Sequence, residues 1–210
     1  DGKLRASLAE RGRSRLGRYQ WAKSADELMA ALERVEANTR RDGAADQPLV
    51  SIVTPSLNQG RFLRRTIESV LNQTYGNIEY LVIDGGSTDG SIEILESYGA
   101  RLRWISEPDR GQSNAINKGF ALARGQIRAY LNSDDMLRPD AVAKVVAFLQ
   151  RNPDCDMVYG EATFIDAQDR EIGNYNTDEY SFERLMRDCC VCQPAAFWRR
   201  GIAERIGPFD

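Results

Sequence analysis

Hydrophobic positions along this 210-residue chain follow two rhythms. Short runs rich in β-branched and aromatic residues are typical of buried strands, and apolar residues that recur every three or four positions are typical of amphipathic helices. The runs predict strands over residues 50–53, 79–83, 102–105, 127–131 and 157–165. The periodic stretches between them predict helices over residues 62–71, 91–98, 115–123 and 139–150. This alternation predicts an α/β fold: a mostly parallel, Rossmann-like sheet with helices on both faces.

The first 47 residues have a different pattern. Ser24 and Glu27 fit a helix capping box, and Leu28, Leu32 and Val35 then share one helical face, which predicts a helix over residues 25–41. We therefore divide the chain into a helical extension with a linker, residues 1–47, and an α/β domain, residues 48–210. The sequence lacks an initial Met, so we expect it to be trimmed at its start. It stops within the turn-like stretch 207–210, so we expect this domain to continue beyond residue 210.

Composition narrows the chemistry. The chain has no His, which removes Ser-His, Cys-His and His-ligated metal sites. Of its four cysteines, three lie within residues 189–192 and Cys155 is distant, a spacing that fits no usual zinc site. Reduced cysteines in a cytoplasmic domain are the simpler interpretation.

Charge is unevenly distributed, although the net charge is only −3. Residues 1–24 hold seven Lys or Arg against two Asp or Glu, whereas residues 48–210 hold eighteen against twenty-three. The acidic body argues against nucleic-acid binding. The basic start suits contact with an anionic membrane, at its inner face, or with a partner; a solvated surface segment is the simpler interpretation.

Polar residues follow each of the first four predicted strands directly. Since loops at the carboxyl ends of parallel strands converge on one crevice, we expect these four clusters to meet. They are residues 54–58, 84–89, 106–111 and 132–135.

Several carboxylates would share that crevice: Asp84, Asp109, Asp134 and Asp135, with Glu107 nearby. Like charges so close repel, and a divalent cation relieves the repulsion. Oxygen ligands without His or Cys favour Mg²⁺ or Mn²⁺, and Mg²⁺ is usually held by one or two carboxylates plus substrate phosphates. The pattern indicates a phosphate-bearing substrate. Taken singly, each acidic loop would be read as a turn or a helix cap.

Other phosphate-binding classes are not supported. The chain contains no G-x-x-x-x-G-K-[ST] sequence, and no G-x-G-x-x-G follows the first strand. Pro55 in that first turn removes a backbone donor.

Four ordered motifs together resemble the family 2 glycosyltransferases, which have the GT-A fold. They are VSIVTPSLNQG, EYLVIDGGSTDGS, EPDRGQSNAINKG and AYLNSDD, and the resemblance covers residues 49–210. It implies a metal-dependent, inverting transfer of a sugar from a nucleoside-diphosphate-sugar to an acceptor hydroxyl, carried by a saccharide, lipid or protein in polysaccharide or glycoconjugate biosynthesis.

The resemblance also implies residue roles. Asp134, with help from Asp135, would hold Mn²⁺ or Mg²⁺, and Asn132 replaces the usual first Asp of the D-x-D element, so it would make a neutral contact, to the ribose. Arg110 would contact the diphosphate, unless it forms a surface ion pair with Asp109 or Glu107. The donor-binding set is Thr54, Pro55, Ser56, Asn58, Asp84, Gly85, Arg110, Asn114, Asn132, Ser133, Asp135 and Gln193.

The acceptor's general base is expected beyond residue 210, with Asp188 and Glu161 as internal candidates. Gln193 either faces the pocket or starts an apolar strand. Two further functions stay open: a non-catalytic nucleotide-sugar-binding domain, and a nucleotidyltransferase that makes sugar-nucleotides, although TPSLNQG lacks the basic Gly-rich loop of that class.

Overall fold

The computed structural model describes residues 47–175, 177, 180–187 and 190–210. The predicted helix 25–41 and the basic segment 1–24 lie outside these residues, as does Asp188. No helix within the described residues is both long and apolar enough to cross a bilayer.

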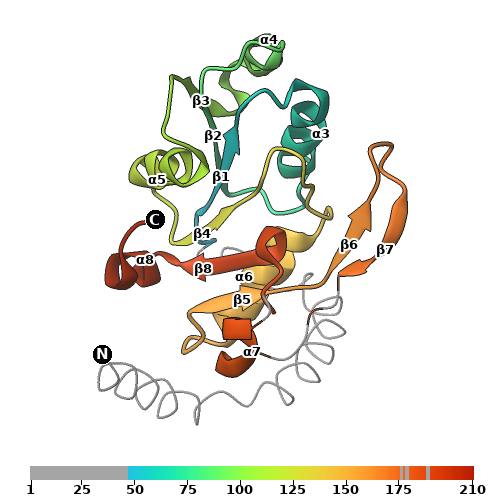
Figure 1. Cartoon of the computed structure of the whole chain (residues 1–210). Helices are drawn as coiled ribbons and strands as arrows, with labels where there is room; N and C mark the ends of the chain where they lie inside the picture. Colours follow the sequence, from blue (N-terminus) through green and yellow to red (C-terminus); the bar gives the residue numbers. More distant parts are fainter. Residues whose placement is uncertain (1–46, 176, 178–179, 188–189) are drawn as a thin grey trace. The chain divides into compact units, whose positions relative to one another are not determined.

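A six-stranded sheet organises the domain, in the order β3-β2-β1-β4-β8-β5. Strands β1 to β4 are parallel, and β8 runs antiparallel to both of its neighbours, β4 and β5. This arrangement confirms the predicted mostly parallel α/β sheet (Figure 1). The strand bounds are β1 (Val50–Ser56), β2 (Ile78–Asp84), β3 (Arg103–Ser106), β4 (Ile127–Tyr130), β5 (Met157–Tyr159) and β8 (Ala196–Arg199).

Helices cover both faces of this sheet, because alternate strand residues point to opposite sides. Val50, Ile52 and Tyr80 pack with α3 (Gly60–Leu71), α4 (Ser91–Ser97) and α6 (Ala141–Arg151) in the larger buried core. On the other face, Val53 and Leu81 pack against α5 (Gln112–Leu122) in a smaller core. Figure 1 shows α5 and α3 on opposite sides of β1.

Pro55 lies inside β1 and does not end it. The pairing of β1 with β2 continues through Pro55 to Ser56, whereas its pairing with β4 stops at Val53 and Tyr130. The Val53 carbonyl points to the β4 side, where it accepts from Leu131 N. Odd-numbered residues of β1 face that side, so the donor that Pro55 lacks falls beyond the last pair and costs the sheet no hydrogen bond.

The predicted strand 157–165 is interrupted at Gly160 and Glu161. Its first part is β5, and its second is β6 (Ala162–Ile165), which pairs with β7 (Glu171–Tyr175) in a separate two-stranded sheet. The chain divides there into two compact units: residues 43–162 with 192–210, and a second unit that includes residues 163–191. The second unit also holds α7 (Phe182–Arg187); the first ends with η2 (Gln193–Ala195), β8 and α8 (Arg200–Ile206).

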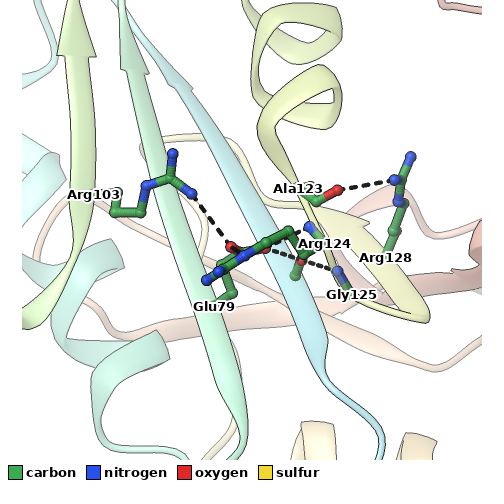
Figure 2. Close-up of polar contacts among 7 residues, drawn as sticks. Glu79, Arg103, Ala123, Arg124, Gly125 and Arg128 are labelled. Carbon is green, nitrogen blue, oxygen red and sulfur yellow. Dashed lines mark hydrogen bonds and ion pairs between the residues drawn. The ribbon is translucent and has the colours of Figure 1, made fainter.

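A buried carboxylate ties the end of α5 to the sheet. Glu79 accepts from Ser51 Oγ at 2.6 Å and from the backbone N–H of Arg124 at 2.7 Å. The guanidiniums of Arg124 and Arg103 approach its other oxygen from the solvent side at 2.8 and 3.3 Å (Figure 2). Because Ser51, Glu79 and Arg103 lie near the starts of their strands, this cluster lies at the amino edge of the sheet.

Candidate functional site

The loops after β1 and β2 are joined by backbone and side-chain hydrogen bonds. Gly85 N donates to Ser56 O at 2.8 Å, and Asn58 N donates to Ser87 Oγ at 2.7 Å. In return, Thr88 N donates to the Asn58 side-chain oxygen at 2.9 Å. Asn58 has a positive φ of 54°, a conformation that Asn tolerates better than most residues.

Asp84 organises the second loop from inside. The residue has 0% of its surface exposed, and its carboxylate accepts from Gly86 N at 3.0 Å and from Ser87 N and Ser106 Oγ, each at 2.8 Å. Ser87 Oγ donates to the other oxygen. The carboxylate thus holds its own loop and the end of β3 together, and the role of Asp84 in donor binding stays a prediction.

The third loop packs onto the second at Gly85. A Cβ at Gly85 would lie 2.9 Å from the Asp109 carboxylate and 3.4 Å from a Leu57 methyl group. Glycine at position 85 therefore lets the loops after β1, β2 and β3 pack on one another without a shift of the Asp109 side chain. Arg110 is exposed at the tip of the third loop, where its backbone N–H donates to Asn114 Oδ1 at 3.3 Å.

The guanidinium of Arg110 makes no ion pair within the described residues, so the predicted alternative of a pair with Asp109 or Glu107 does not form there. Glu107 pairs instead with Lys118 of α5 at 2.7 Å.

The fourth loop, residues 132–135, is held by α3. Thr66 Oγ1 lies 2.8 Å from the carbonyl oxygens of both Ser133 and Asp135. Thr66 is a polar residue within the apolar stripe of its helix, a signal that could have identified it from the sequence.

Asn132 is the centre of a side-chain hydrogen-bond network. Its side-chain oxygen accepts from Gln112 Nε2 at 2.6 Å, and its Nδ2 donates to Asp135 Oδ2 and Gln193 Oε1, each at 3.0 Å. Gln193 Nε2 in turn donates to Tyr130 O at 2.8 Å. Gln193 thus contacts the fourth loop, and the apolar strand expected in the same stretch is β8, which starts at Ala196. That Gln193 faces a bound donor stays a prediction. Gln112 was not predicted, because nothing in the sequence pairs it with Asn132.

The two acids of this loop differ in environment. Asp134 is exposed, whereas Asp135 is half-buried. Burial raises the pKa of Asp135, the Asn132 hydrogen bond opposes that rise, and the charge of Asp134 adds to it.

The fourth loop would offer a divalent cation two neighbouring carboxylates, Asp134 and Asp135. Within the described residues, no three His, Cys, Asp or Glu side chains gather as a metal site. One exposed carboxylate beside a second that is already hydrogen-bonded matches the kind of Mg²⁺ site that substrate phosphates complete. Of the cysteines in the described chain, Cys155 is half-buried and Cys190 is buried, and both are free thiols.

Two hydroxyl groups of the predicted donor set are buried at the end of β1. Thr54 is 0% exposed, and its hydroxyl lies 3.0 Å from Tyr80 Oη. Ser56 is 4% exposed, and its Oγ is buried with no hydrogen-bond partner in the described structure. An unpaired buried hydroxyl costs stability. Of the two hydroxyls, Ser56 Oγ is therefore the one whose hydrogen-bonding capacity is wholly unused in the described structure. Glu161, a candidate base, is exposed after β5.

A protein-family model described as glycosyl transferase family 2 matches residues 51–207. The chain belongs to this family. The match spans all four polar loops, Gln193 and β8, so the family relationship covers the site as well as the sheet.

Curated relatives agree with this family. A PGL/p-HBAD biosynthesis glycosyltransferase of Mycobacterium bovis (strain BCG / Pasteur 1173P2) is 34% identical over 168 residues, which cover 78% of this chain and 64% of the relative. A chondroitin synthase of Escherichia coli is 38% identical over 142 residues, covering 66% of this chain and 21% of the synthase. The chain thus spans less than two thirds of the length of these relatives.

Solved structures support the GT-A fold. Residues 1–349 of S. aureus TarS, in complex with UDP-GlcNAc, superpose with a TM-score of 0.63 at 17% identity, covering 75% of this chain and 47% of that one. The mannosyltransferase PcManGT from Pyrobaculum calidifontis, in complex with GDP-Man and Mn²⁺, gives a TM-score of 0.60 at 21% identity, covering 90% of this chain and 57% of that one.

Proposed function

We propose that this chain forms the donor-binding part of an enzyme that transfers a sugar from a nucleoside-diphosphate-sugar to an acceptor hydroxyl, with inversion and with the help of a divalent cation. The observation that carries the proposal is the convergence of four loops at the carboxyl edge of one sheet. Hydrogen bonds and close packing hold these loops together, and the exposed groups that they present include the carboxylate of Asp134 and the guanidinium of Arg110.

The joined loops after β1 and β2 would hold the nucleoside. Ser56 Oγ brings a buried hydroxyl with unused hydrogen-bonding capacity, and Asn58 and Gly85 shape the wall around it. Asn132 would offer the ribose a neutral amide, because no carboxylate stands at that position. Thr54 would serve as a structural residue, since its hydroxyl is used by Tyr80.

Asp134 and Asp135 would hold Mg²⁺ or Mn²⁺, which when bound stabilises the negative charge that develops on the departing diphosphate. Arg110 would add a charged donor to the same phosphate oxygens. Asn114 would hold the Arg110 loop in place through the Arg110 backbone amide. These groups together lower the barrier for breaking the bond between sugar and phosphate.

The acceptor hydroxyl must lose a proton to a carboxylate base as it attacks. A single displacement places this hydroxyl on the side of the anomeric carbon opposite to the diphosphate, which inverts the configuration. For the base we keep the prediction of a residue beyond position 210, with Asp188 and Glu161 as candidates within the chain.

Relatives guide the choice of donor. The solved structures above contain UDP-GlcNAc and GDP-Man, so a thermal-shift panel begins with UDP and GDP sugars and extends to dTDP and CMP sugars, each with and without Mn²⁺. A ligand at 100 times its Kd adds about 2.7 kcal/mol to folding stability. For a domain of this size, the expected rise in Tm is about 5–10 °C.

Asp134→Asn is expected to lose the Mn²⁺-dependent part of that shift and to keep the rest. The exposed Asp154→Asn, a matched change away from the strand ends, should keep both parts. Release of a nucleoside diphosphate on adding acceptors supports transfer, whereas release of pyrophosphate from a nucleoside triphosphate would indicate a nucleotidyltransferase. Metal-dependent binding with no turnover in the full protein would indicate a binding domain.

A further inference from the structure

A side-chain amide on α5 forms hydrogen bonds with the backbone N–H and C=O of a residue 92 positions further along the chain. Asn117 Nδ2 donates to Phe209 O at 2.7 Å, and Phe209 N donates back to Asn117 Oδ1 at 2.9 Å. Two hydrogen bonds to the backbone N–H and C=O of one residue fix both the position and the orientation of segment 207–210. Figure 1 shows this end of the chain beside α5.

Three aromatic rings receive the Phe209 ring, and we name them the aromatic seat: Phe120, Tyr130 and Trp198. Phe209 stacks on Phe120 with centroids 6.1 Å apart and planes 23° apart. It meets Tyr130 edge-on at 5.5 Å and Trp198 at 6.2 Å. Phe120 and Trp198 also contact each other at 5.5 Å, so the seat exists as a unit and joins α5, β4 and β8.

The seat is a direct neighbour of the fourth loop. Tyr130 contributes its ring to the seat and its carbonyl oxygen to Gln193, and Gln193 accepts from Asn132. Segment 207–210 therefore lies beside β4 and β8, next to α5. The loops that would hold the nucleoside follow β1, β2 and β3, on the other side of β4 in the sheet order.

This placement has a chemical consequence. In a single displacement the attacking hydroxyl approaches the anomeric carbon opposite to the leaving phosphate. If the nucleoside lies over β1 to β3 and the metal-held phosphates lie at the end of β4, the acceptor approaches from the β8 side, where segment 207–210 is fixed.

We propose that Asn117 is a positioning residue for acceptor use: by holding the Phe209 peptide against the aromatic seat, it fixes the chain on the acceptor side of the site. The inference rests on the proposed sugar transfer. Asn117 acts through segment 207–210 and touches neither donor nor metal. Losing it should therefore affect the acceptor's kinetic constants and spare the donor's.

The test uses the full protein with Mn²⁺, UDP-GlcNAc or GDP-mannose as donor, and p-nitrophenyl glycosides as acceptor probes. In Asn117→Ala, kcat/KM for the acceptor should fall about tenfold, the effect of losing hydrogen bonds worth about 1.4 kcal/mol in net terms. The donor's KM should stay within about twofold, because the loops after β1 to β3 are untouched. Asn117→Asp keeps the oxygen that accepts from Phe209 N and loses the donor to Phe209 O. Its kcat/KM for the acceptor should therefore lie between those of wild type and Asn117→Ala. This variant also covers the case in which the alanine variant fails to fold.

Asn152→Ala is the matched control, because it also removes an Asn amide bonded to a backbone carbonyl, at the end of α6. It should change neither constant. Equal changes in the donor's and the acceptor's KM, or no change in either, would overturn the inference while leaving the proposed transfer intact. If the wild-type protein releases no nucleoside diphosphate with any probe, the proposed transfer fails and the role of Asn117 fails with it.

Discussion

Arg124 binds the carboxylate of Glu79 with two different groups, its backbone N–H at 2.7 Å and its guanidinium Nε at 2.8 Å. The backbone contact matters more, because the guanidinium is largely exposed and screened by solvent. Ser51 extends the connection: its hydroxyl donates to Glu79 and accepts from Gly125 N at 2.8 Å. One carboxylate therefore fixes the end of α5 on the sheet, at the edge away from the four loops.

We predict that Glu79→Gln lowers the free energy of unfolding by about 2 kcal/mol at neutral pH, since hydrogen bonds to charged groups contribute about 1.5–3 kcal/mol. An amide also places an N–H₂ group where the donors of Arg124 and Ser51 converge. Urea unfolding at pH 7 measures the change. Glu96→Gln, an exposed position on α4, should be neutral; an equal loss in both variants would argue against a specific role for Glu79.

The same carboxylate makes stability depend on pH. Burial alone raises the pKa of Glu79, but the Arg124 backbone amide, the Ser51 hydroxyl and the Arg124 guanidinium outweigh it, so the pKa lies below its usual value of 4.5. A lowered pKa in the folded state means that the stabilisation is complete above pH 4.5 and disappears as the pH falls through the folded-state pKa. The gap between wild type and Glu79→Gln should therefore narrow below pH 4.5. A gap of constant size down to pH 3 would contradict this.

Gly119 lets α5 approach the sheet closely. A Cβ at this position would lie 2.3 Å from one Val53 methyl group and 3.2 Å from Ile83 Cγ1. We predict that Gly119→Ala costs about 1–3 kcal/mol of stability through overpacking, despite the better helix propensity of Ala. Gly76→Ala is the control, because its Cβ meets nothing within 4 Å. Comparing the two Tm values tests the prediction, which fails if Gly119→Ala is as stable as wild type.

The sheet was predictable because its strands are short apolar runs separated by amphipathic helices. Strands β1 to β4 and helices α3 to α6 all lie within a few residues of their predicted ranges. Strand β8 was harder to place: β8 pairs antiparallel between β4 and β5, about 70 residues after its neighbour β4, and only tertiary contacts decide that pairing. The division of residues 157–165 into β5 and β6 was not predicted for the same reason, because periodicity does not show which sheet a strand joins.

The site was predictable as a set of loops but not as a network. The convergence of parallel strand ends follows from topology, so the meeting of the loops that carry Asn58, Asp84 and Asn132 could be predicted from the sequence. Their partners, such as Gln112 and Ser106, could not, because each contact joins elements distant in sequence.

Asn132 suggests a test with a counterintuitive outcome. Asn132→Asp restores the acidic first position of the D-x-D element, yet it would place a carboxylate where an amide now donates to Asp135 and Gln193 at 3.0 Å. We predict a loss of about 1–3 kcal/mol at pH 7 through lost donors and like-charge repulsion. The loss of stability should be smaller at pH 5, where proton uptake by the introduced carboxylate and Asp135 relieves the repulsion between them.

Asn132→Ser is the comparison, since it shortens the side chain without adding charge. Its loss of Tm should not change between pH 7 and pH 5. If Asn132→Asp is as stable as wild type at both pH values, the amide network is not what holds the loop.

Arg110 gives the most direct test of the diphosphate contact. Its guanidinium is exposed at the end of β3 and makes no ion pair within the described residues, so it is available to a phosphate. We predict that Arg110→Ala weakens binding of UDP-GlcNAc or GDP-mannose about 10- to 100-fold, the effect of losing a charge-assisted hydrogen bond of about 1.5–3 kcal/mol. Arg110→Lys should recover part of the affinity, because a lysine keeps the charge but not the two-pronged geometry.

Titration calorimetry at low and high salt measures both effects. Arg101→Ala removes an arginine just before β3, at the opposite edge of the sheet, and should leave the affinity unchanged. Because an exposed charge is screened by ions, the difference between wild type and Arg110→Ala should shrink as salt rises. Equal weakening by Arg101→Ala and Arg110→Ala would point to a general effect of net charge, and the diphosphate would then have to be held by other groups.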